Sequence, residues 1–195
     1  MHGLINTAIQ AFVTSTYGTE RWKDVMEHAG LGFTEFEAML IYPDEQSAKV
    51  LVALENVLGR PLADTLEDMG TFLVSDPKAE ALRRLLRFGG VTYVEFLHSL
   101  DDLPDRARLA VSDLHLPGLE LVEQAPGQFD LYCQEGLAGY ANVMMGILRA
   151  MADDYGDLVI LDHAGHREDA DVISISLVET QFAEGRVFDL GGRVR

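Results

Sequence analysis

Histidines and carboxylates gather at one place in the chain, where they could bind a metal ion. His163 and His166 lie close together in the segment DHAGHRED. Imidazole and carboxylate are ligands for divalent cations, so the segment allows a weak metal site. The same composition is typical of a solvated turn between two strands, and we favour that interpretation. The acids of the segment and its margin are Asp162, Glu168, Asp169 and Asp171.

Sequence patterns typical of enzymes are missing. There is no P-loop, no Gly-x-Ser-x-Gly and no His-Glu-x-x-His motif. The acidic pairs Asp101-Asp102 and Asp153-Asp154 are more simply a helix cap and a solvated helix end. The single cysteine, Cys133, cannot form an internal disulfide, and its expected place on a strand is that of a small buried hydrophobe. We therefore expect no catalysis by the chain itself.

The chain is strongly acidic, with 15 basic and 32 acidic residues and a formal net charge of −17. This charge repels nucleic acids and anionic membrane surfaces and leaves a basic protein partner compatible. The length of 195 residues and the 48% hydrophobic content fit a single domain over residues 1–195. The N-terminus lacks a signal-peptide pattern, and no apolar run approaches the roughly 20 residues of a membrane span. We expect a cytoplasmic protein.

Apolar residues recur at helical spacing through the first two thirds of the chain, and glycines and prolines mark the ends of each run. After a glycine pair, a longer helix is expected to begin near Thr92. Gly18 is expected to end the first helix, and Thr19 and Asp44 are expected to cap the helices that follow. The other expected helices are an N-terminal one through Val13, residues 19–28, one holding Phe33, Phe36, Met39 and Leu40, Asp44 to Gly59, 61–74 and 77–88.

The last third of the chain changes to the alternating pattern of strands. Between residues 171 and 179, valines and serines alternate with Ile173, Ile175 and Leu177, as in a sheet with one buried face. A helix near 138–154 separates the second and third strands, so the fold class is α+β: a helical part, then an antiparallel four-stranded sheet with an inserted helix. The expected strands are 119–123, 128–134, 158–162 and 171–179, with a turn at 125–127.

Several stretches resemble one known family, the heme-nitric oxide/oxygen binding (H-NOX) domains. They are MHGLINTAIQAF, TYGTERWKDV, FGGVTYVEFLHSLDDL, EGLAGYANVMMGILRAMA and FAEGRVFDL, in this order along nearly the whole chain. The resemblance implies a b-type heme between the helical part and the sheet, its iron bound by a histidine on a long helix. It further implies a proline thirteen residues later that presses on the porphyrin, and a Tyr-x-Ser-x-Arg strand motif that holds the propionates. A bound gas changes the iron–histidine bond, and the fold relays the change to a signalling protein.

Proline occupies the family's iron-ligand position in this chain. The family's Leu-Asp-x-Leu-His corresponds here to the segment from Leu100 to Pro104, and the pressing proline falls on Pro117, thirteen residues later. That second match supports the register. Proline offers no donor atom to iron, and it removes the backbone N–H that would bond to the Leu100 carbonyl. We therefore expect the helix to bend or restart within one turn of Pro104, with Asp102 as a new cap.

The propionate clamp is also altered. In the segment LYCQEGL, either Gln134 or Glu135 stands where the family has arginine, and both registers remain open. An arginine fork pairs with a carboxylate, whereas a glutamate repels it. With two heme contacts changed, we expect heme to be weakly held or absent, and any bound heme to differ from the histidine-ligated form.

Four further residues are candidates for this site. Ile5 matches a wall of the pocket, and Tyr140 matches a position whose tyrosine can bond to oxygen on iron. A core tyrosine whose hydroxyl reaches the surface is the simpler interpretation of Tyr140. His98 and His115 are alternative iron ligands, although His98 lies about 240° around the helix from Pro104. A packed or half-exposed histidine is the simpler interpretation of both.

Three readings of function follow. The first is a stand-alone sensory or regulatory domain of this type that signals to a separate protein such as a diguanylate cyclase or a histidine kinase. The second is a heme-free interaction module that keeps the H-NOX fold with a filled or repurposed pocket. The third, an enzyme that uses the C-terminal His/Asp cluster, has the least support.

Overall fold

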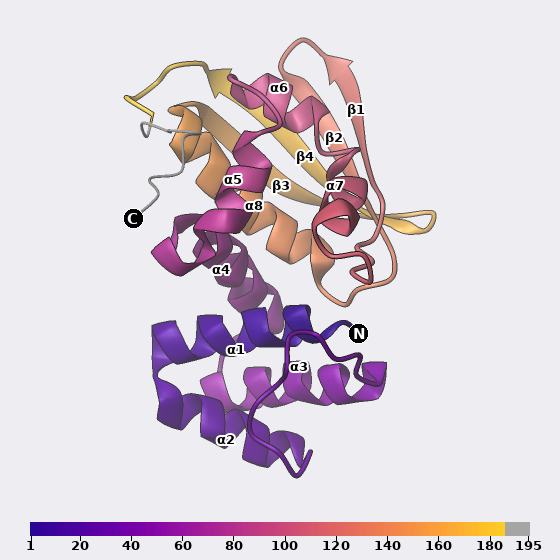
Figure 1. Cartoon of the computed structure of the whole chain (residues 1–195). Coiled ribbons are helices and arrows are strands. Elements are labelled where there is room, and N and C mark those ends of the chain that lie inside the picture. The colour runs from indigo at the N-terminus through magenta and orange to yellow at the C-terminus, as the bar shows by residue number, and fades with distance from the viewer. Residues whose placement is uncertain (186–195) are drawn as a thin grey trace.

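The apolar stripe near the N-terminus forms the first of four helices that make the lower part of the molecule (Figure 1). We describe residues 1–185 of a computed structural model. Glycines end three of the helices, and at Gly30 and Gly59 the backbone is left-handed, which suits a residue without a side chain. Thr19 and Asp44, expected as caps, are instead the first helical residues. The helices are α1 (Gly3–Tyr17), α2 (Thr19–Ala29), α3 (Asp44–Leu58) and α4 (Leu62–Ser75).

The upper part of the molecule is an antiparallel sheet with helices packed on its inner face (Figure 1). The four strands lie in the order β1-β2-β4-β3, and α8 connects β2 to β3. The predicted fold class is confirmed. The elements are η1 (Pro77–Ala79), α5 (Glu80–Arg87), α6 (Tyr93–His98), α7 (Leu103–Ala110), β1 (Leu119–Ala125), β2 (Gln128–Gln134), α8 (Tyr140–Tyr155), β3 (Leu158–Arg167) and β4 (Ala170–Glu179).

Each part has its own apolar cluster, and the crossing of α4 with α8 joins them. Val143 of α8 packs against both clusters. The helices approach closely at two glycines: a Cβ on Gly70 would lie 2.0 Å from the Val143 carbonyl oxygen, and one on Gly146 would lie 1.9 Å from that of Glu67. An ion pair between Arg149 and Glu67 bridges the same crossing. The absence of side chains at both positions therefore sets the distance between the two parts.

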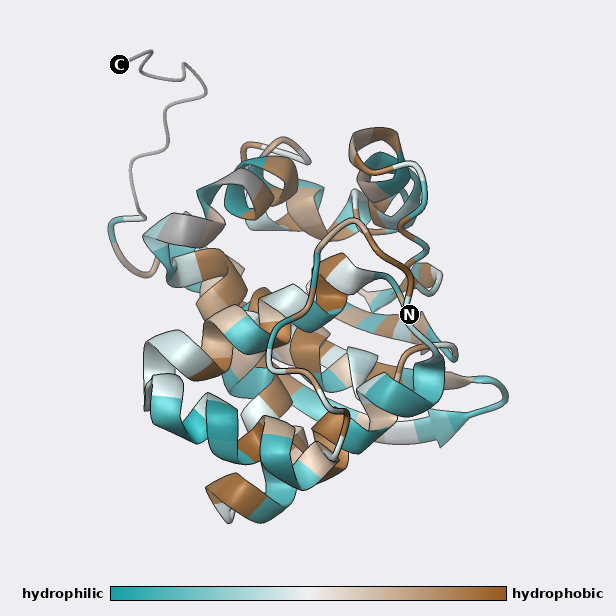
Figure 2. Cartoon of the chain, turned by 60° about the horizontal axis from the view of Figure 1, so that its bottom comes forward, coloured by the Kyte–Doolittle hydropathy of each residue, from teal (hydrophilic) through white to brown (hydrophobic). Residues whose placement is uncertain are grey.

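The prediction of a helix that holds Phe33, Phe36, Met39 and Leu40 is wrong. The α2–α3 connection, residues 31–43, is an irregular segment of turns and extended backbone. Its aromatic residues turn inward: Phe36 is buried and its ring lies 4.9 Å from that of Tyr42. Met39 and Leu40 turn outward, so the four residues do not share one face. In Figure 2 this connection crosses the front of the molecule, with hydrophobic colouring on its stretch beside the N-terminus.

The turn in the segment DHAGHRED is shorter than the sequence predicts. Strand β3 runs to Arg167, so His163 and His166 belong to the strand, and the turn consists of Glu168 and Asp169. A register shift between His163 and His166 marks a bulge opposite β4. The segment DHAGHRED has the polar composition of a loop, but strand β4 is long enough to pair with its residues His163, His166 and Arg167. In the described part of the chain, no helix is long and apolar enough to cross a membrane.

Candidate functional site

The helix expected to begin near Thr92 is broken before Pro104, as the sequence predicts. Helix α6 ends at His98, and α7 begins at Leu103, so Pro104 lies in its first turn. The first N–H groups of a helix have no intrahelical acceptor, so proline is tolerated there without losing a hydrogen bond. Asp102 takes the cap position, but its side chain makes no cap bond.

Two charged side chains hold the break in place. The Arg106 guanidinium donates to the Ser99 carbonyl at 2.7 Å, and a second, longer bond of 3.4 Å goes to the Leu85 carbonyl. Asp101 accepts a 2.8 Å bond from the backbone N–H of Leu121 and so ties the break to strand β1. Sequence reasoning gave Arg106 no role and assigned Asp101 to a helix cap, because Leu85 and Leu121 are about twenty residues from their partners along the chain.

The interior beside the break is filled with apolar side chains. Leu97 and Leu100 are fully buried, and Leu103 is only 4% exposed. They belong to the cluster that contains Phe129 and Leu131 of the sheet. The apolar lining that the family resemblance implies is present, and the protein alone covers these side chains.

Tyr140 and Cys133 lie together in this interior. Tyr140 is the first residue of α8 and is 6% exposed, and its hydroxyl has no hydrogen-bond partner among the described residues. Burial raises the pKa of Tyr140, and the nearby Cys133 adds to the shift. Burial also raises the pKa of Cys133 to about 12, which keeps this thiol protonated and unreactive at neutral pH. The expectation that the tyrosine hydroxyl reaches the surface is wrong: it is buried and lacks a partner.

Pro117, the match to the family's pressing proline, lies close to the end of strand β2. Its Cγ is 3.7 Å from the place that a Cβ on Gly136 would take. The next residue, Gly118, packs against the Gln134 side chain and accepts the Gln134 N–H at 2.9 Å. The structure thus brings the segment of Pro117 and Gly118 next to Gln134, one of the two candidate clamp positions.

Glu135 turns to the surface and not into the interior. Its carboxylate is 70% exposed and lies 3.5 Å from His166 Nε2, whose Nδ1 lies 3.2 Å from Asp171. The hydrogen bond to Asp171 raises the pKa of His166, and the charges of Asp171 and Glu135 add to it. Sequence reasoning did not pair these residues, because their meeting depends on the register of β2 with β4, in which Cys133 faces Asp171.

The other candidate ligands stand apart from the buried tyrosine. His98 is exposed at the end of α6, and its ring centroid lies 5.9 Å from that of Phe129, with the two rings nearly perpendicular. His115 is exposed in the loop after α7, where its Nδ1 lies 3.0 Å from the Asp113 carbonyl. Ile5 is half-buried on α1 and packs against the lower cluster. Among residues 1–185, no group of three or more histidine, cysteine or acidic side chains is arranged to hold a metal ion.

Two open hollows lie on the outer side of the lower part, between α2 and α3. They share His28 and Asn56, and Arg21 and Val52 are among the residues that line one or the other. None of the site residues predicted from the sequence borders either hollow.

A family model described as Haem-NO-binding matches residues 2–163 of this chain. Among curated proteins, the soluble guanylate cyclases gcy-31 and gcy-35 of Caenorhabditis elegans are 23% and 28% identical over 154 and 156 residues. These alignments cover 79% and 78% of this chain but 22% of each cyclase, so the chain spans less than a quarter of their length.

Solved structures share the fold at low sequence identity. An H-NOX protein from K. algicida in the unliganded Fe(II) state superposes with a TM-score of 0.80 at 15% identity, covering 94% of this chain and 100% of that one. An H-NOX protein from S. oneidensis in the Fe(II)NO state gives 0.72 at 17% identity, covering 92% and 100%. At these identities the likeness shows the fold alone.

Proposed function

The chain belongs to the Haem-NO-binding family, and on that premise we propose that it is a sensory or regulatory domain that controls a separate signalling protein. The observation that carries the proposal is the family match over residues 2–163, together with the H-NOX fold. A diguanylate cyclase or a histidine kinase is the kind of partner we propose, because the resemblance implies one. In this proposal the chain senses or relays a signal and does not catalyse a reaction.

The partner proposal is tested by titration. Purified chain is added to a histidine kinase or a diguanylate cyclase from the same genome, and autophosphorylation or cyclic dinucleotide formation is followed. We expect the rate to change and to saturate near one chain per partner. Unchanged rates with every such enzyme would contradict the proposal.

The residues present do not fit a heme whose iron is bound at position 104. Pro104 has no donor atom, and the surface-facing carboxylate of Glu135 offers no positive charge to a propionate. The buried hydroxyl of Tyr140 is the one feature of this set that suits a polar group bound in the interior. We therefore propose that the chain does not bind heme through the family's histidine position, and we assign no signalling step to heme.

An absorption spectrum of the chain with added heme tests this point. We expect little or no bound heme in the wild-type chain, and more in Pro104→His, which restores an imidazole at that position. Stoichiometric, tightly held heme in the wild-type chain would contradict the expectation of little or no heme, and its loss in His98→Ala or in His115→Ala would identify the ligand.

A second candidate function is a heme-free interaction module with a filled pocket. The complete burial of Leu97 and Leu100 by protein atoms favours it. The two candidates differ in their response to a ligand: a filled module regulates its partner equally with and without heme, nitric oxide or oxygen, whereas a sensor does not.

A further inference from the structure

We propose that the tip of the α2–α3 connection is the surface through which this domain binds its protein partner, and that the partner presents a basic amphipathic helix. The tip consists of Met39, Leu40 and Ile41, with Leu4 of α1 beside it. The inference rests on the proposed function only in assuming a protein partner. It adds the location of the contact and the chemistry of what binds there.

The tip exposes three apolar side chains that are consecutive in the sequence. Met39 is 79% exposed, Ile41 64%, Leu40 48% and Leu4 37%. A single exposed apolar residue is ordinary, but several that adjoin mark an interaction site. These residues add little to the lower core, so the folding of the domain does not account for them.

The backbone holds the tip firmly against the start of α1. The Gly3 N–H donates to the Leu40 carbonyl at 2.7 Å, and the Tyr42 N–H donates to the Met1 carbonyl at 2.9 Å. A side chain on Gly3 would collide with the Glu37 carbonyl, at 2.0 Å from a Cβ, so the two segments are in direct contact. His2 and Ile41 also form an isolated antiparallel bridge.

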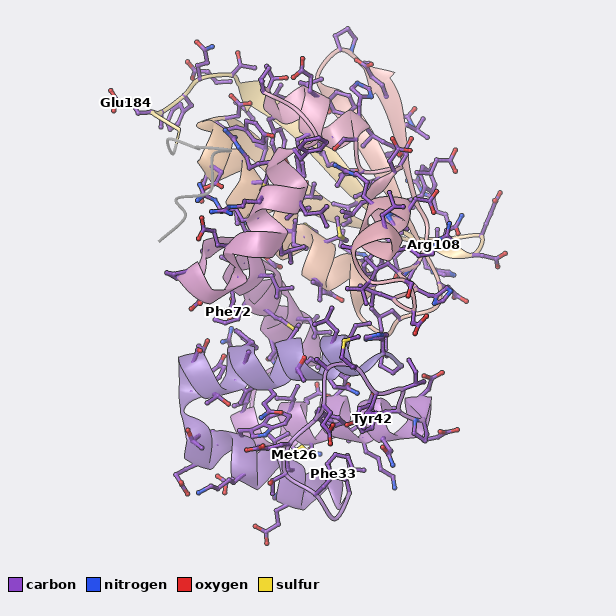
Figure 3. The ribbon with its side chains drawn as sticks, viewed as in Figure 1. Met26, Phe33, Tyr42, Phe72, Arg108 and Glu184 are labelled. Atoms are coloured by element: carbon purple, nitrogen blue, oxygen red, sulfur yellow. The ribbon has the colours of Figure 1, made fainter. Side chains whose placement is uncertain are left out.

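Bonds on the inner side anchor the rest of the connection. The Trp22 indole donates to the Thr34 carbonyl at 2.8 Å, and the Tyr42 hydroxyl accepts the Glu37 N–H at 2.8 Å. The rings of Phe33 and Tyr42, both labelled in Figure 3, lie 6.0 Å apart on this segment. A surface held in this way loses little conformational freedom when a partner binds, which favours affinity.

The charges around the tip select the partner. Between Lys23 and Lys49 the sequence contains no lysine or arginine. An apolar tip can also insert into a lipid surface, but a chain of net charge −17, with the exposed Glu35 and Glu37 just before the tip in the sequence, is repelled by anionic lipids. A helix that offers apolar side chains flanked by Lys or Arg is complementary in both respects. The acids of the interval are Asp24, Glu27, Glu35, Glu37, Asp44 and Glu45.

Binding of two synthetic peptides to the full chain tests the proposal. One is a fluorescent amphipathic helix of leucine and lysine, and the other replaces each lysine with glutamate; anisotropy reports binding. We expect the lysine peptide to bind, more weakly at high salt, and the glutamate peptide not to bind. The double variant Met39→Ser/Ile41→Ser should weaken binding about tenfold or more, since two apolar contacts are lost.

A matched control variant distinguishes binding at the tip from nonspecific hydrophobic binding elsewhere on the surface. Leu109 and Val91 are 89% and 84% exposed on other elements, so Leu109→Ser/Val91→Ser removes as much exposed apolar surface elsewhere. We expect this control to bind within about twofold of the wild-type chain. Charge reversal by Glu35→Lys/Glu37→Lys should weaken binding of the lysine peptide and reduce the salt dependence of its affinity.

Three results would overturn the inference: no binding of the lysine peptide, equal losses in the two serine variants, or tighter binding to phosphatidylglycerol vesicles than to the peptide. Regulation of the signalling enzyme separates this failure from failure of the proposed function. If Met39→Ser/Ile41→Ser regulates the enzyme as well as the wild-type chain does, the assignment of the tip as the partner surface is wrong, while the proposed function stands. If the wild-type chain regulates no enzyme, the proposed function fails, and the peptides still decide whether the tip binds a basic helix.

Discussion

At the scale of single residues, two buried tyrosines differ in how their hydroxyls are satisfied. Tyr93 donates a 3.1 Å bond to the Leu148 carbonyl, whereas the hydroxyl of Tyr140 has no partner in the described part of the chain. A buried polar group without a partner destabilises the folded state by about 1–3 kcal/mol. The position that the family resemblance assigns to ligand contact is therefore unfavourable for stability in the unliganded fold.

Removing the two hydroxyls should have opposite effects on stability. We expect Tyr140→Phe to leave the free energy of unfolding unchanged or to raise it by about 1 kcal/mol, because an unsatisfied group is removed. Tyr93→Phe should lower it by about 1 kcal/mol, because the Leu148 carbonyl loses its donor. Urea denaturation of the heme-free chain measures both, and equal losses would show that Tyr140 has a partner.

The charge of His166 should depend on its contact with Asp171. The pKa of His166 is raised mainly by that hydrogen bond, so the contact stabilises the fold fully below the pKa of the unfolded chain. The contribution is lost as the pH rises through the folded-state pKa. We expect Asp171→Asn to lower the pKa of His166 in an NMR titration, with a smaller decrease in Glu135→Gln, since Glu135 contributes less. A greater effect of Glu135→Gln would reverse this order.

At the scale of elements, the break between α6 and α7 is stabilised by specific hydrogen bonds. A capping box between Thr92 and Glu95 starts α6, Arg106 donates to the Ser99 carbonyl just after α6, and Asp101 within the break accepts from the Leu121 N–H of strand β1. Proline alone prevents a continuous helix but does not determine where the two pieces lie. The long-range bonds of Arg106 and Asp101 do so.

Loss of the Arg106 side chain should destabilise the break. We expect Arg106→Ala to lower the free energy of unfolding by about 1–3 kcal/mol, since the Ser99 carbonyl loses a charged donor. Arg108→Ala is the matched control, because Arg108 pairs with the exposed Asp105 on the same helix. Its effect should stay within about 0.5 kcal/mol. Denaturation curves that coincide for the two variants would refute the role given to Arg106.

At the scale of the whole molecule, the contact of α4 with α8 joins two cores that are otherwise separate. Gly70 and Gly146 let the helix backbones approach, and each position faces a backbone atom that cannot move aside as a side chain would. The relative position of the lower helices and the sheet therefore depends on two residues without side chains. The proposed partner surface lies on the lower part, and the buried tyrosine lies in the upper one.

A methyl group at this crossing should separate the two parts. We expect Gly146→Ala to lower the midpoint of thermal unfolding, with a loss of about 1–3 kcal/mol from overpacking. Asp153→Ala, on an exposed position of the same helix, should change stability by no more than about 0.5 kcal/mol. Stability that is unchanged or raised in Gly146→Ala would mean that the crossing tolerates a wider spacing.

The sequence by itself determined the order of elements, the fold class and the break at Pro104, because these follow from local periodicity and from the chemistry of proline. It failed for residues 31–43, where apolar side chains with apparent helical spacing divide between the core and the surface. It also failed for Tyr140, whose hydroxyl environment depends on segments far apart in the chain. The contacts that only the tertiary structure shows are those of Arg106 and Asp101 at the break, of Glu135 with His166, and of Gly3 at the start of α1 with Leu40. Each of these contacts joins residues that local sequence patterns cannot relate, since the register of strands and the packing of helices bring them together.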